Sequence, residues 1–106
     1  MHQNLNRYFW LVLVALFFFQ VISIAQPLTG IKNIPGNYAT LEAAIIDLNL
    51  QGVGAGGVTF NVAAGHTETF STQGAGIINA NGTQSDQILF QKSGAGANPL
   101  ITAALN

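Results

Sequence analysis

The side chains best suited to chemistry are His66 and Glu68, which stand two positions apart in a segment expected to be extended. Residues at this spacing on a strand project from the same face, so the two side chains could form a hydrogen-bonded pair or supply two metal ligands. A zinc site needs three or four ligands, and from Gln26 onward the sequence has no other histidine and no cysteine. We therefore interpret them as a solvated turn pair and predict no metal site and no catalytic site.

The glycine-rich run from Gly52 to Gly57 matches the dinucleotide-binding pattern G-x-G-x-x-G. This pattern holds a pyrophosphate only where it leaves a strand and opens a helix. Here it follows an expected helix and precedes an expected strand, so the geometry is reversed. We interpret the run as a flexible loop and predict no cofactor.

Glu42 and Asp47, five positions apart on the same helix, point to different sectors and are not an acid/base pair.

Charge is sparse from Gln26 onward, where two lysines and four carboxylates give a formal net charge of −2. The only arginine of the chain, Arg7, lies before this part. Nucleic acids and anionic membrane surfaces are bound by clusters of lysine and arginine, so we exclude both classes of partner. The chain has no cysteine, so no disulfide framework supports the fold.

The first 25 residues have the three-part pattern of a cleavable export signal. A polar, positively charged start precedes an apolar run over residues 9–19, and the small residues Ser23 and Ala25 stand three positions and one position before Gln26. Signal peptidase substrates share this order, whereas a membrane-spanning helix needs about 20 apolar residues. We predict cleavage before Gln26, a secreted or outer-surface location, and no membrane span after cleavage.

A short amphipathic helix is predicted from Thr40 to Gln51, after a lead-in segment over residues 26–39. Thr40 suits the N-cap position, and Gly52 suits a left-handed helix end. The apolar residues of the helix recur at helical spacing and would form one core face: Leu41, Ala44, Ile45 and Leu48.

Short strands with Gly- and Asn-rich corners are expected after the helix. Residues 58–62 alternate between apolar and polar types, as a strand with one buried face does, and further extended pieces are expected at residues 66–70, 76–78, 88–90 and 100–102. This order favours a mainly β fold, a β-solenoid whose open strand edge is covered by a capping helix; a β-sandwich fragment is the alternative. Because about 80 residues without disulfides make only a marginal core, we expect the domain over residues 40–106 to be incomplete.

Three segments together resemble the start of pectin-lyase-like right-handed parallel β-helices: NYATLEAAI at residues 37–45, GVTFNV at 57–62 and GHTET at 65–69. With residues 87–91 and 99–101 included, the chain is similar to the amino-terminal part of large secreted or surface proteins of Bacteroidetes-type bacteria. Such proteins are often exported through the type IX route and carry a sorting domain at the far end. The resemblance implies a capping helix and the first coils of a right-handed parallel β-helix, without the sorting domain.

The resemblance and the sparse charge lead to two functional hypotheses. The first is a non-enzymatic structural or adhesive module, with a polysaccharide or cell-surface glycan as partner and the missing C-terminal coils of the same protein completing the solenoid. The second is the N-terminal part of a polysaccharide-degrading lyase or glycoside hydrolase whose active site lies in downstream coils. Four aromatic residues could stack on sugars, but their spacing favours packing in the core or cap. They are Tyr38, Phe60, Phe70 and Phe90.

Overall fold

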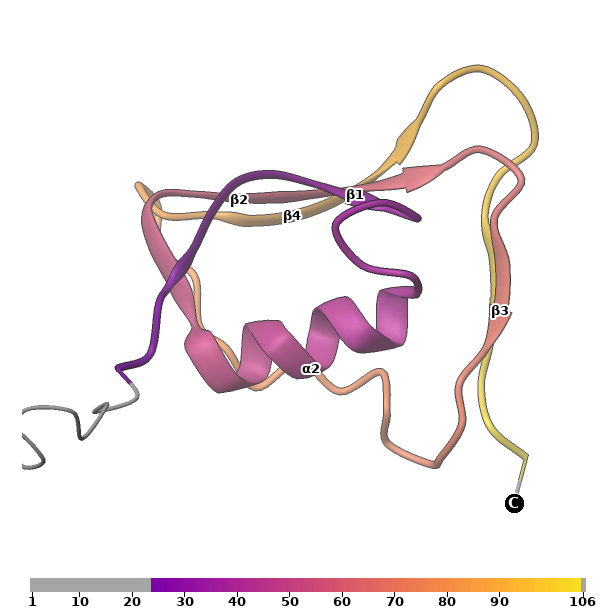
Figure 1. Ribbon diagram of the computed structural model, residues 1–106, viewed down its shortest axis with the longest axis horizontal. Helices are drawn as coiled ribbons and strands as arrows, with labels where there is room; N and C mark the ends of the chain where they lie inside the picture. Colours follow the sequence, from indigo (N-terminus) through magenta and orange to yellow (C-terminus); the bar gives the residue numbers. More distant parts are fainter. Residues whose placement is uncertain (1–23, 106) are drawn as a thin grey trace, which may run out of the picture.

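Five strands and a single helix form the part of the protein that the computed structural model describes, residues 24–105 (Figure 1). In chain order the elements are β1 (Leu28–Ile34), α2 (Leu41–Gln51), β2 (Val53–Ala63), β3 (Thr67–Thr69), β4 (Ile88–Ser93) and β5 (Leu100–Thr102). The prediction of a mainly β fold with one short helix is therefore confirmed.

The strands form two small parallel sheets. One sheet has the order β1-β2-β4, and the other pairs β3 with β5. Val58 pairs with Ile88, 30 positions later, and Thr67 pairs with Leu100, 33 positions later. We call each stretch that starts at a strand of the three-stranded sheet a circuit: residues 28–52, 53–87 and 88–102. A β-sandwich is built from antiparallel sheets, so the sandwich alternative finds no support.

Helix α2 begins and ends where the local signals predict. The backbone N–H of Ala43 donates to Thr40 Oγ1 at 3.1 Å, which makes Thr40 the N-cap. At the other end Gly52 has φ 76° and donates its N–H to the carbonyl of Leu48 at 2.8 Å. Both interactions satisfy backbone groups that a helix end otherwise leaves without a partner. The helix buries three residues of its predicted core face, Ala44, Ile45 and Leu48. The fourth, Leu41, is partly buried and packs against the core.

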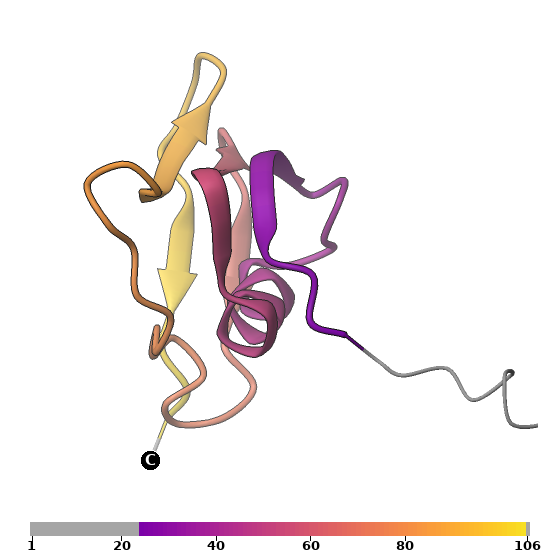
Figure 2. The same ribbon diagram turned by 90° about the vertical axis from the view of Figure 1, so that its left-hand side faces the viewer.

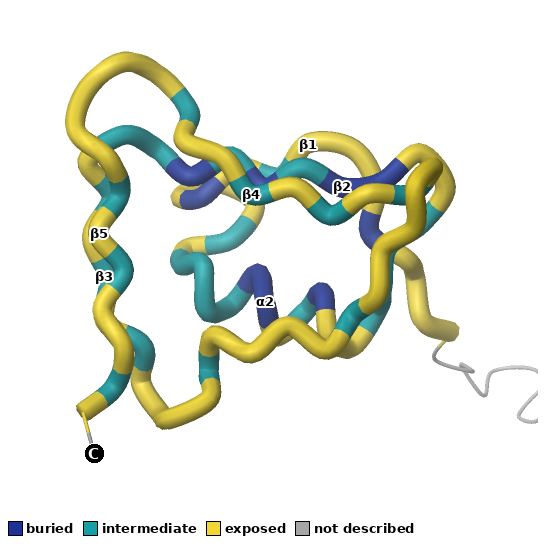
Figure 3. Tube along the Cα trace, turned by 180° about the vertical axis from the view of Figure 1, so that it is seen from behind, coloured by how far each residue is buried: buried dark blue, intermediate teal, exposed yellow. Residues whose placement is uncertain are grey.

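The apolar core lies between α2 and the inner faces of β1 and β2. Alternate residues of β2 are buried (Val58, Phe60 and Val62), and the Phe60 ring stacks on that of Phe90 with centroids 4.8 Å apart. Figure 3 shows the buried residues gathered on these three elements. Burial of a side chain of this size stabilises the fold by about 1.5–3 kcal/mol, so this small cluster supplies much of the apolar stabilisation.

The predicted lead-in segment contains a strand that the sequence analysis missed. Residues 28–34 form β1 and pair with β2, where Gly30 lies opposite Val58 and Lys32 opposite Phe60. Residues opposite one another share a face of the sheet, so glycine and lysine occupy the inward row of β1. Because these two positions are not apolar, β1 lacks the alternation of apolar and polar residues that identifies a strand in a sequence.

The glycine-rich run is also not the flexible loop that was predicted, because β2 already begins at Val53. The pairing with β1 shifts register between Leu28 and Gly30, which leaves an irregularity in this part of the ladder. Gly57 has φ 83°, and a Cβ there would lie 2.6 Å from the carbonyl oxygen of Gln87. The glycine thus allows β2 to lie close to the segment that leads into β4. A further prediction, a strand at residues 76–78, is wrong, since that segment has no regular structure.

Helix α2 fills the first circuit and leaves the outer edge of the sheet open. Figure 2 shows β1, β2 and β4 side by side with the helix beneath them. Within residues 24–105, β1 is one of the two edge strands of this sheet and has a strand partner on one side only. The expected packing of the helix onto the first circuit is present, but its expected cover of the strand edge is not.

Candidate functional site

The side chain of Glu68, at the middle of β3, makes hydrogen bonds to three other residues. Its Oε1 accepts a hydrogen bond from the backbone N–H of Leu41 at 2.6 Å, and its Oε2 accepts one from the N–H of Glu42 at 3.1 Å. These donors belong to the first turn of α2, where N–H groups have no partner within the helix. A carboxylate at this position also interacts favourably with the helix dipole.

His66 completes this arrangement, with Nε2 2.6 Å from Glu68 Oε1. The two side chains are only 11% and 7% exposed, so the predicted pair forms, but its interpretation as solvated is wrong. Burial raises the pKa of Glu68; the hydrogen bonds from His66 and from the two backbone N–H groups outweigh it and hold that pKa below its usual value. The geometry therefore stabilises an ionised carboxylate.

Local backbone contacts explain why the pair faces the helix. The N–H of His66 donates to the carbonyl of Ala63 at 3.1 Å, which turns the chain between β2 and β3. The carbonyl of His66 accepts from the N–H of Leu100 at 2.8 Å, where β5 starts beside β3. In β3 the neighbours of Glu68 are exposed while Glu68 is not, so the alternation of a strand turns its carboxylate toward α2.

Glu42 and Asp47 bind different partners, as their helical spacing predicts. Glu42 accepts hydrogen bonds from Ser71, with Oγ 2.6 Å from Oε1 and the backbone nitrogen 3.2 Å from Oε2. Asp47 accepts a hydrogen bond from the hydroxyl of Tyr38. Burial, followed by the hydrogen bond and the negative charge of Asp47, raises the pKa of Tyr38 to about 12. Both contacts fasten α2 to neighbouring segments and do not combine into an acid/base pair.

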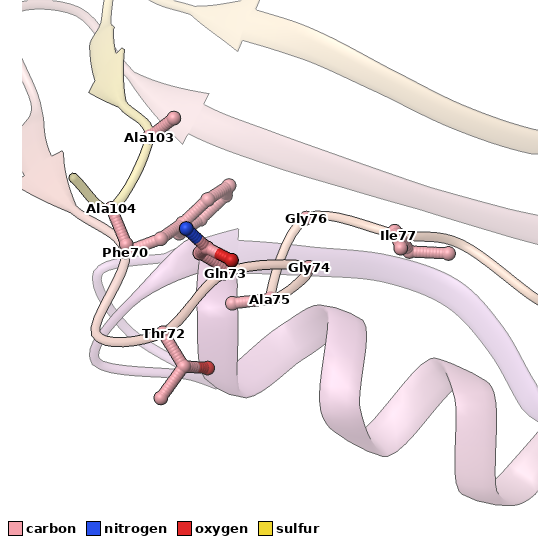
Figure 4. A pocket seen from close by; sticks show the side chains of 9 residues that line it. All are labelled: Phe70, Thr72, Gln73, Gly74, Ala75, Gly76, Ile77, Ala103 and Ala104. Atoms are coloured by element: carbon pink, nitrogen blue, oxygen red, sulfur yellow. The ribbon is translucent and has the colours of Figure 1, made fainter. Parts of the chain in front are cut away.

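A shallow pocket of about 410 Å³ lies between the loop after β3 and the residues that follow β5 (Figure 4). Phe70 forms one side and packs against Gly76, where a Cβ would lie 2.6 Å from the aromatic ring. The lining has no titratable side chain, so the pocket offers space and apolar surface without a group for proton transfer. The lining residues are Phe70, Thr72, Gln73, Gly74, Ala75, Gly76, Ile77, Ala103 and Ala104.

The other aromatic residues pack against one another, in agreement with their interpretation as packing residues. Phe60 is fully buried, with the ring of Phe90 stacked on it and the ring of Tyr38 tilted by 49° at a centroid distance of 6.2 Å. A buried ring has no face free for a sugar. Asp86 lies in a bend, where its N–H donates to Thr83 Oγ1 at 3.0 Å.

The predicted cleavage position lies at the border of the described chain. Ser23 falls outside the described residues, while Ala25 and Gln26 are exposed and have no regular structure. The backbone N–H of Gln26 donates to Gln51 Oε1 at 2.8 Å, next to the end of α2. Over residues 24–105 we find no helix long and apolar enough to cross a membrane. The same residues contain no group of three His, Cys, Asp or Glu side chains placed to hold a metal ion.

Comparison with known proteins gives no relative: no family model, no curated protein and no solved structure matches the chain. The resemblance to pectin-lyase-like proteins therefore remains a hypothesis based on the sequence motifs.

Proposed function

We propose that the chain forms the first circuits of a right-handed parallel β-helix in an exported or cell-surface protein, and that it serves there as a structural or adhesive module without catalytic activity. A polysaccharide or a cell-surface glycan is the partner of this module. Further coils of the same protein continue the two sheets beyond β4 and β5.

The parallel stacking of consecutive circuits is the observation that carries the proposal. Six consecutive residue pairs join β2 to β4 without a register shift, from Val58–Ile88 to Ala63–Ser93. In the second sheet, β3 and β5 pair in the same parallel way, with Glu68 opposite Ile101. The second and third circuits thus place strands in the same two sheets, which supports the proposed solenoid, in which each coil stacks on the one before it.

Two further observations support the handedness and the stacking. Parallel strands joined by a crossover are right-handed in nearly all proteins, and β1-α2-β2 is such a unit. Side chains also stack between circuits: Gln91 Nε2 donates to Asn61 Oδ1 at 2.8 Å. Amide stacking between equivalent positions is favourable where strands repeat in register.

The polar groups of the described chain favour a structural role. Glu68, Glu42 and Asp47 each bind to a group that fastens α2 in place. A general acid or base must instead be within reach of a substrate proton, and these carboxylates are already engaged in contacts that hold the fold together.

Export is tested by expressing the full-length gene and determining the N-terminus of the released protein by mass spectrometry. We expect the protein outside the cytoplasm, starting at Gln26. Ala25→Trp should block processing because the position before the cut requires a small residue. Ile24→Phe, one position earlier, is the matched control and should be processed normally. Release of both variants with an intact leader would contradict export by cleavage.

The adhesive role is tested by incubating the released protein with insoluble neutral and acidic polysaccharides. We expect retention on at least one of them without the appearance of new sugar ends. New reducing or unsaturated ends would replace the adhesive role with the enzymatic alternative. Failure to bind any of the polysaccharides would contradict a glycan partner.

A further inference from the structure

Glu68 joins two consecutive circuits of the chain. Its carboxylate, in the second circuit, binds the N–H groups of Leu41 and Glu42, which lie 27 and 26 positions earlier in the first. His66 supplies a third hydrogen bond from the turn before β3. The first turn of α2 is thus held against β3 by one nearly buried, titratable group.

We propose that Glu68 and His66 form an acid-sensitive clasp, which holds the start of α2 at neutral pH and releases it when Glu68 takes up a proton. This regulatory device goes beyond the proposed function and does not depend on it. Its consequence is a local opening of the first circuit in acid, while the remainder of the core stays packed.

Few charged or titratable groups lie on the elements packed around Glu68. Helix α2 contributes the carboxylate of Glu42, which is turned toward Ser71, and further along Asp47, which is bound to Tyr38. Strand β5 places Ile101 opposite Glu68 and brings no titratable residue. The described chain, residues 24–105, has no lysine within ion-pair distance of Glu68. The contacts with His66 and with the two backbone N–H groups therefore stabilise the carboxylate.

The direction of the pH effect follows from the hydrogen bonds. They favour the ionised form and lower the pKa of Glu68 in the folded state. The stabilisation is fully present above the pKa of this carboxyl in the unfolded chain, and it is lost as the pH falls through the lower pKa of the folded state. After protonation one oxygen carries a hydrogen and the charge is gone, so three donors face a weakened acceptor.

The opening is local because the rest of the helix has other attachments. Ala44 and Leu48 are fully buried in the core, one and two turns beyond the clasp. The bond between Glu42 and Ser71 is exposed and offers the first turn only a weaker second tie. Parts of a protein with few buried contacts open independently of global unfolding.

The test is an NMR titration of the full-length protein from about pH 7 to about pH 2, a range that spans carboxyl titration. We expect the amide signals of Leu41 and Glu42 to titrate with the midpoint of the Glu68 carboxyl carbon, below the usual value for glutamate. Hydrogen-exchange protection of these amides, corrected for the intrinsic rate, should fall about tenfold or more, as loss of a charged acceptor predicts. The Val58 amide should not change over this transition.

Variants separate the clasp from general acid unfolding. Glu68→Gln should abolish the shared transition, and Glu42→Gln, the matched control on the same turn, should retain it. The proposal is overturned if the amides titrate in Glu68→Gln, or if Glu42→Gln alone removes the transition. If Glu68→Gln does not fold, the native protein decides: simultaneous changes at Leu41 and Val58 would mean global unfolding and no clasp.

Discussion

The earlier and later parts of the described chain share one parallel sheet but pack differently. All core residues lie between Leu28 and Val62, whereas no residue from Ala63 to Leu105 is buried. Strand β2 has a neighbouring strand on each side, and β4 has one. The first circuit is also an edge, yet Leu28 and Ile34 are buried there, within the cluster against which α2 packs. Residues of a strand are thus buried where α2 packs against their face of the sheet, even in an edge strand.

The strongest test of this difference compares two stacked rings. Phe60→Ala should reduce the free energy of unfolding by about 3–5 kcal/mol, as removal of a buried ring does. Phe90→Ala removes a half-buried ring from the edge strand and should cost about 1 kcal/mol. Chemical denaturation followed by circular dichroism measures both. Equal losses would mean that the third circuit is as well covered as the second.

A pair of glycines tests how closely β2 approaches the segment that leads into β4. Gly56 and Gly57 both have positive φ, 87° and 83°, so alanine at either position costs about 1–2 kcal/mol in backbone strain. A Cβ at Gly56 meets nothing within 4 Å, while one at Gly57 meets the backbone of Gln87. We expect Gly57→Ala to cost about 3 kcal/mol in total because overpacking adds to the strain. Similar denaturation midpoints for the two variants would contradict a close contact at Gly57.

The N-cap of α2 tests the local stability of the first circuit. Thr40→Ala removes the acceptor for the N–H of Ala43 and should lower the free energy of unfolding by about 1 kcal/mol. Thr40→Ser keeps the hydroxyl and serves as the control, with an expected loss well below that of alanine. Thermal melts of the three proteins give the comparison. A serine variant as unstable as the alanine variant would assign the effect to the lost methyl group.

The smallest effect is expected on the exposed face between the second and third circuits. The side-chain bond from Gln91 to Asn61 should contribute about 0.5 kcal/mol, the lower end for a hydrogen bond, because both residues reach solvent. A double-mutant cycle with Asn61→Ala, Gln91→Ala and the combined variant measures this coupling. Strictly additive losses would show that the bond adds nothing to the stacking of β2 and β4.

Local sequence signals determined the helix and the central strand. Thr40 and Gly52 mark the ends of α2 because their interactions reach only three or four positions along the chain. The alternation at residues 58–62 identifies the inner part of β2, since every second side chain of a strand points the same way. The spacing of His66 and Glu68 likewise predicted a shared face.

Only the tertiary structure decided what these elements contact. Strand β1 has Gly30 and Lys32 in its inward row, so pairing with β2 and not its own apolar pattern makes it a strand. Glu68 binds a helix start 26 and 27 positions away, a distance over which sequence spacing carries no geometric information. The sequence by itself thus determined the features that depend on neighbouring residues, while the stacking of circuits decided the sheet order, the low exposure of the His66 and Glu68 side chains, and the open edges.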